Sequence, residues 1–190
     1  MALDSYLDAN YSNEYVLEQL RLDFDGDNRI KKSLRIVNKI VVRNPLEEFI
    51  TTHKTELKSA LKKKSDRNII LVALLNSAFP FSFDVLKTFG RYFAVQEIIN
   101  SETIKKAISN VYGGNRATEN GIYSVVPMFI EAGLFDRQQQ GLYRFGEPLL
   151  VHHEITLRAY RESFNTNINN RLGYSEQSSD PYFVFLTPRN

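Results

Sequence analysis

Glycines divide residues 101–145 into segments whose apolar side chains follow different periodicities. Before Gly113 the apolar residues recur every three or four positions, which is typical of a helix that ends at glycine. Ser101 is the expected N-cap of this helix. A second helix is expected to start near Thr118 and to stop at Gly133. Its expected buried face contains five apolar residues: Ile122, Val125, Val126, Phe129 and Ile130.

The residues that follow Gly133 predict a short β-hairpin. Residues 134–137 and 142–145 alternate between apolar and polar side chains, as half-buried strands do. The connection from Gln138 to Gly141 is short and contains glycine, which is a hairpin signal. Residues 101–145 are therefore predicted to form a helix, a turn, a second helix and a two-stranded hairpin.

This order, with FIEAGLFDRQQQGLYRF at residues 129–145, resembles the winged helix-turn-helix superfamily over about a quarter of the chain. In that superfamily the second helix lies in the DNA major groove, and the hairpin touches the backbone or the minor groove. The resemblance implies DNA contacts from eight residues: Arg116, Thr118, Asn120, Tyr123 and Ser124 on the second helix, and Arg137, Gln139 and Arg144 on the hairpin.

Two alternatives remain open for this unit. Pro127 falls inside the expected second helix, where proline costs about 3 kcal/mol, so the helix is either kinked or divided into two pieces. The unit either contacts DNA or acts as a scaffold that binds protein or only packs.

The charge is distributed unevenly along the chain, although the net charge is only +2. Residues 1–28 contain seven acids and one arginine, whereas residues 29–67 contain twelve basic residues and four acids. A helix expected over residues 28–42 presents a stripe of Lys31, Arg35 and Lys39. Because like charges four residues apart repel, this stripe suggests an anion such as a nucleic-acid backbone. The alternative is a solvated face that the acidic first segment neutralises.

The predicted fold is mainly α, with a helical bundle that carries the winged-helix unit and a small hairpin. Residues 1–64 are expected to form an N-terminal helical region, in which one helix runs from Pro45 to about Lys63. Residues 65–164 are expected to form the winged-helix domain, and residues 165–190 a polar tail. In this tail, residues 182–186 are a candidate third strand for the hairpin sheet.

A helix expected from Pro148 to about Phe164 carries apolar residues at heptad spacing. They are Leu150, His153, Leu157, Tyr160 and Phe164. Such a seam either closes the domain or pairs with a second copy of the chain, so a homodimer through residues 148–164 is a candidate assembly.

Several other classes of function lack a signal in the sequence. There is no nucleophile elbow, phosphate loop or dinucleotide motif, so we expect neither catalysis nor a cofactor. The chain has no cysteine and three histidines, and no metal site is expected. Its longest apolar run, at residues 69–75, is too short to span a membrane, and a cytoplasmic protein is expected.

The expected function is therefore duplex DNA binding of the winged-helix type, either as a transcriptional regulator or as a phage-defence accessory. The latter role comes from a further resemblance to a small accessory protein of BREX phage-defence operons. It depends on the basic early helix, the middle bundle and the EAGLF turn at residues 131–135. The alternative is a protein-interaction or assembly module that binds no nucleic acid.

Overall fold

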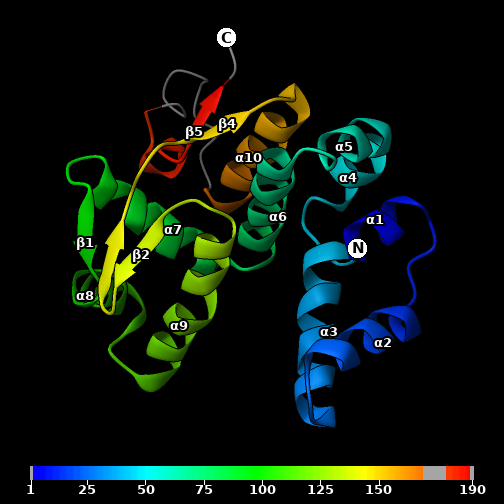
Figure 1. The fold of residues 1–190 in the computed structure, drawn as a ribbon, viewed down its shortest axis with the longest axis horizontal. Coiled ribbons are helices and arrows are strands. Elements are labelled where there is room, and N and C mark those ends of the chain that lie inside the picture. Colours follow the sequence, from blue (N-terminus) through cyan, green and yellow to red (C-terminus); the bar gives the residue numbers. More distant parts are fainter. Residues whose placement is uncertain (1, 169–178, 189–190) are drawn as a thin grey trace.

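The computed structural model describes residues 2–168 and 179–188, and its architecture is mainly helical (Figure 1). Two hydrophobic cores lie on opposite sides of helix α6 (Lys64–Ala78). Ile70 and Leu74 of α6 belong to the N-terminal core, whereas Ile69 and Val72 belong to the larger core formed with the C-terminal half of the chain. Because α6 is buried on most of its circumference, it is the central element of the fold.

The N-terminal core is formed with α6 by residues of α1 (Ala2–Leu7), α3 (Asp27–Val41), α4 (Glu47–Thr52) and α5 (Lys54–Ala60). Helix α2 (Asn13–Asp23) packs against α3 outside this core. Gly26, with φ of 87°, forms the turn between α2 and α3. The helix predicted from Pro45 to Lys63 is instead two short helices that meet at His53. Thr51 and Thr52 precede this break, and β-branched residues are weak helix formers.

The larger core contains α7 (Pro80–Phe93), β1 (Ile98–Asn100), α8 (Ser101–Tyr112), α9 (Arg116–Glu131), β2 (Asp136–Gln139) and β3 (Leu142–Arg144). The three strands form an antiparallel sheet in the order β1-β3-β2. The predicted hairpin is thus present, and β1, which was not predicted, adds a third strand to it. Both helix starts differ from the prediction, because Asn100 caps α8 and Asn115 caps α9.

The C-terminal part consists of β4 (Leu149–Val151), α10 (Glu154–Asn167), the 3-10 helix η1 (Pro181–Phe183) and β5 (Leu186–Pro188). The prediction of a helix from Pro148 is wrong at its start, because residues 149–151 form a strand. β5 pairs in parallel with β4 and does not extend the hairpin sheet. Of the predicted polar tail, residues 169–178 lie outside the described part of the chain.

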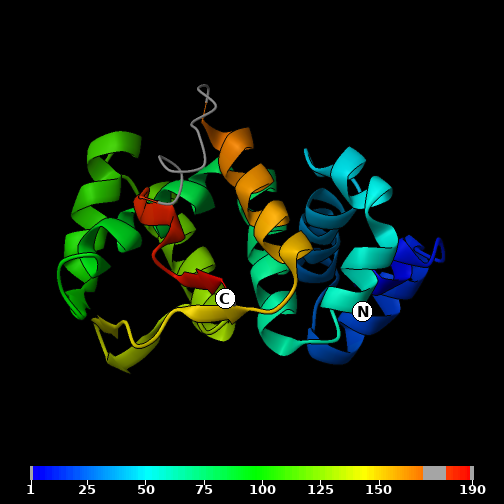
Figure 2. The ribbon, with the colours of Figure 1, turned by 90° about the horizontal axis from the view of Figure 1, so that it is seen from above.

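The predicted seam on residues 148–164 is used inside the chain. Figure 2 shows α10 alongside α6, between the N-terminal helices and the rest of the fold. Tyr160 and Phe164 are fully buried there, and His153 is the N-cap of α10 rather than part of a helical stripe. The seam therefore closes the domain, which leaves Leu150 as its exposed member.

No helix within residues 2–168 and 179–188 has the length and apolar character needed to cross a bilayer.

Candidate nucleic-acid interface

Helix α9 presents most of the predicted contact residues to solvent. Gly113, with φ of 84°, ends α8, and the Asn115 side chain accepts a hydrogen bond of 3.0 Å from the amide of Thr118. These two features fix where α9 begins and which side faces the core. Arg116, Asn120, Tyr123 and Ser124 are exposed on the opposite side, as the sequence predicted.

Thr118 is an exception among the predicted residues, because it is only 6% exposed. It lies one helical turn before Ile122 and therefore shares the buried side of α9. Its hydroxyl lies 3.4 Å from the Tyr112 carbonyl oxygen. Thr118 also precedes Val125 by seven residues, so the helical spacing that predicted the buried face places Thr118 on it, and the prediction that Thr118 faces outward was wrong.

Pro127 does not divide α9, which is continuous from Arg116 to Glu131. The proline lacks the N–H that would otherwise bond to the carbonyl of Tyr123. Pro127 and Tyr123 are both exposed, so water can satisfy that carbonyl. The helix therefore tolerates proline on its solvent side, and its core face is unchanged.

A backbone hydrogen bond connects the hairpin to the first turn of α8. The backbone N–H of Ser101 donates a 2.8 Å hydrogen bond to the carbonyl of Gly141, whose φ of 80° shapes the turn. All of β2 is exposed, which includes Arg137 and Gln139, and Arg144 of β3 is exposed as well. The three predicted hairpin residues are thus accessible next to the helix pair.

A hollow of about 470 Å³ lies between α8, α9 and the hairpin. Two predicted residues, Tyr123 and Arg137, line it together with Lys105 and Gln140. Lys105 Nζ lies 2.6 Å from Glu102 Oε1 and 5.2 Å from the centre of the Tyr123 ring. The hydrogen bond to Glu102 raises the pKa of Lys105 above its ordinary value, so the amine stays charged at neutral pH.

Lys105 was not among the predicted contact residues. Lys105 directly follows the buried Ile104, so it lies at the edge of the buried stripe of α8, and this position was the available signal. Gln140 belongs to the hairpin turn. Both residues join the site through the docking of the hairpin onto α8.

The basic stripe on α3 is exposed at Lys31, Arg35 and Lys39. Within the described residues these three side chains form no ion pair, although Lys39 Nζ lies 4.3 Å from the centre of the Phe79 ring. The acidic first segment is connected to basic residues elsewhere, since Asp8 pairs with Lys58 of α5. The stripe thus keeps its positive charge on the surface.

Helix α3 lies on one side of α6 and α9 on the other (Figure 1). Arg29 of α3 lines an open groove that also contains Ser124 and Met128 of α9. Lys31 is about 160° around the helix from Arg29, so it faces away from this groove. The structure therefore brings Arg29, rather than Lys31, toward α9.

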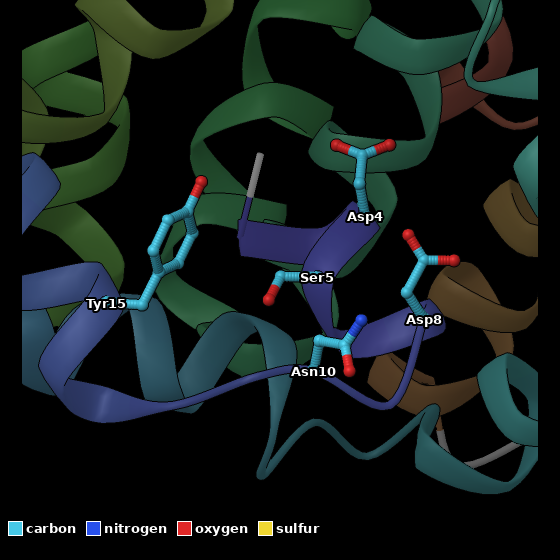
Figure 3. Close-up of a pocket in the computed structure, with 5 residues that line it drawn as sticks. All are labelled: Asp4, Ser5, Asp8, Asn10 and Tyr15. Atoms are coloured by element: carbon cyan, nitrogen blue, oxygen red, sulfur yellow. The ribbon is translucent and has the colours of Figure 1, made fainter.

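An acidic hollow of about 440 Å³ lies at the N-terminus, between α1 and α2. Figure 3 shows Asp4 on α1 and Asp8 directly after its last residue, with Tyr15 across from them on α2. Asp8 already pairs with Lys58. Among the described residues, no group of three or more potential ligands could hold a metal ion.

Comparisons with known protein families, with curated proteins and with solved structures give no significant match to this chain.

Proposed function

We propose that this protein binds duplex DNA through a winged-helix unit formed by residues 80–145. The observation that carries the proposal is the solvent exposure of Arg116, Asn120 and Tyr123 on one side of α9, next to a hairpin that exposes Arg137. The order α7, β1, α8, α9, β2, β3 and the sheet order β1-β3-β2 also support the winged-helix assignment. In this proposal α9 enters the major groove, and the hairpin contacts the backbone.

The proposed roles follow from the chemistry of each side chain. Arg116 and Asn120 are able to read guanine and adenine edges through paired hydrogen bonds. Arg137 and Lys105 sit where the hairpin meets the helices, and they are suited to phosphate oxygens. The cations of α3 supply longer-range attraction, because their charges are exposed and unpaired among the described residues.

Fluorescence anisotropy with a labelled random-sequence duplex tests the proposal. Binding should weaken as salt rises, with log K falling by about 0.9 per phosphate contact against log salt. Replacing Lys31, Arg35 and Lys39 by Glu should weaken binding to all duplexes alike. The double change Arg116→Ala and Asn120→Ala should instead alter the preference among selected sequences.

Arg91→Glu serves as the charge control, because Arg91 is exposed on α7 and lines neither the hollow nor the groove. This variant should bind DNA as the unmodified protein does, within about twofold. Absence of binding at low salt would reject the proposal. Equal losses from all three sets of changes would mean that the interaction is unspecific, and it would reject the assigned role of α9.

A further inference from the structure

A second surface of the protein is an open groove of about 920 Å³ between α3, α6 and α9. It lies on the side of α9 away from the hairpin, and its lining includes neither Arg116 nor Asn120. Among the predicted DNA contacts Ser124 also lines this groove, so the inference is tested at residues that the two surfaces do not share.

The floor of the groove is apolar and accessible. Leu71 is 40% exposed, although it belongs to the IILVALL run of α6 whose other members are buried. Met128 of α9, on the facing wall, is 42% exposed. Leucine and methionine side chains that remain accessible in one hollow are typical of protein-interaction sites.

The groove continues toward α1. A neighbouring hollow of about 270 Å³ between α1, α3 and α6 shares Ile40, Arg67 and Leu71 with it. The lining of this second hollow is also mainly apolar, with Val37, Val41 and Leu61 on its walls. The accessible apolar surface is therefore elongated, which suits an extended or helical segment better than a compact ligand.

The rim of the groove is mainly basic. Arg29, Lys64 and Arg67 line it, against one acid, Glu131. Within the described residues none of these three cations forms an ion pair, although the Arg29 guanidinium lies 4.6 Å from the centre of the Phe24 ring. The charges that surround the apolar floor are thus available to a negatively charged partner.

We infer that this groove binds an acidic amphipathic helix of a partner protein. The apolar face of that helix would cover Leu71 and Met128, and its carboxylates would lie next to Arg29, Lys64 and Arg67. A nucleic acid has the negative charge that the basic rim requires, but it has no apolar face that would cover the floor of the groove. A segment that is both apolar and acidic satisfies the two properties together.

The probe for the test is a fluorescein-labelled peptide of about 18 residues, or about five helical turns, with Leu and Phe along one face and Glu elsewhere. The inference predicts saturable binding that weakens by about tenfold or more in Leu71→Asp and in Arg67→Glu. Val95→Asp and Arg91→Glu are the matched controls, since both residues are exposed and lie outside the groove. They should bind the peptide with unchanged affinity.

Two further peptides test the charge and the pattern. A peptide with Lys in place of Glu, and a scrambled peptide of the original composition, should each bind at least about tenfold more weakly. Equal binding of either peptide would overturn the inference. So would Leu71→Asp binding as well as the unmodified protein, provided that circular dichroism shows the variant to be folded. If Leu71→Asp does not fold, Met128→Asp on the opposite wall of the groove is tested in its place.

The alternative occupant is a second copy of this chain. Concentration-dependent self-association in sedimentation velocity, abolished by Leu71→Asp, would overturn the inference in favour of that copy. The double variant Arg116→Ala, Asn120→Ala should keep full affinity for the peptide. Peptide binding therefore tests the groove even if the protein does not bind DNA. Loss of peptide binding in that variant would contradict the assigned groove.

Discussion

The Asp66 carboxylate lies 2.9 Å from Nδ1 of His153, although the two residues are 87 positions apart in the chain. Asp66 is completely buried in the first turn of α6. Its other carboxylate oxygen lies 3.1 Å from the backbone nitrogen of His152, which donates to it. A single carboxylate therefore joins the start of α6 to the start of α10, the two helices that connect both cores.

Asp66→Ala should lower the free energy of unfolding by about 1–3 kcal/mol, because it leaves the partly buried donors of His152 and His153 without their acceptor. Asp66→Asn should cost less, since its amide keeps one acceptor oxygen. Urea unfolding followed by circular dichroism measures both changes. Asp25→Asn, at an exposed position, is the matched control. An Asp66→Ala protein as stable as this control would show that the contact contributes nothing.

Gly90 of α7 lies directly against the C-terminal segment. A Cβ atom at this position would lie 2.0 Å from the carbonyl oxygen of Pro181, which is backbone and cannot rotate away. Gly90→Ala should therefore displace residues 179–188 and destabilise the fold by about 1–3 kcal/mol. Thermal unfolding and limited proteolysis of the C-terminal segment would both report the change.

Gly146→Ala is the control for that experiment, because a Cβ atom there meets nothing within 4 Å. It should leave stability unchanged within about 0.5 kcal/mol. If both variants behaved alike, the close approach of α7 to Pro181 would be wrong.

Tyr182 should make the protein sensitive to alkaline pH. Burial raises the pKa of its phenol from 10.0 to about 12, while Asn76 and Ser163 lie within hydrogen-bonding distance of the hydroxyl, at 2.9 and 3.1 Å. Between these two pKa values the unfolded chain loses this proton and the folded chain keeps it. The contribution is therefore fully present below pH 10 and is lost as pH rises toward 12.

The expected loss from this residue is on the order of 2–3 kcal/mol across that interval. Urea unfolding at a series of alkaline pH values measures it. Tyr182→Phe should be less stable at neutral pH but should show a shallower alkaline decline. Tyr15→Phe, at an exposed position, should keep the original decline. Identical pH profiles for Tyr182→Phe and the unmodified protein would contradict the prediction.

Substitutions at two residues of the helix–hairpin unit should differ in their effect on DNA affinity. Arg137→Gln should weaken binding and reduce the slope of log K against log salt by about one phosphate contact, because Arg137 is exposed on β2. Thr118→Val should leave affinity unchanged, because Thr118 faces the core. Anisotropy titrations at several salt concentrations distinguish these outcomes. A loss of DNA affinity in folded Thr118→Val would contradict the arrangement of α9.

Sequence periodicity correctly predicted the elements that depend on neighbours a few residues away. The mainly helical class, the helices that became α8 and α9, and the hairpin all follow from local spacing and glycine positions. The exposure of Arg116, Asn120 and Tyr123 was predictable for the same reason. DNA binding itself remains a prediction. Thr118 was assigned to the wrong side, although its spacing of four and seven residues from Ile122 and Val125 places it on the buried side of the helix.

Long-range pairing was decided by tertiary structure alone. β4 and β5 are three residues each and pair across 34 intervening residues, so neither carries a periodic signal of its own. The contact of Asp66 with His153, the hollow that joins Lys105 to Arg137 and the groove between α3 and α9 likewise combine distant segments. The sequence determined which faces are apolar, because that depends on local spacing. Packing of the whole chain determines which of these faces contact one another. The candidate sites form where that packing brings distant segments together.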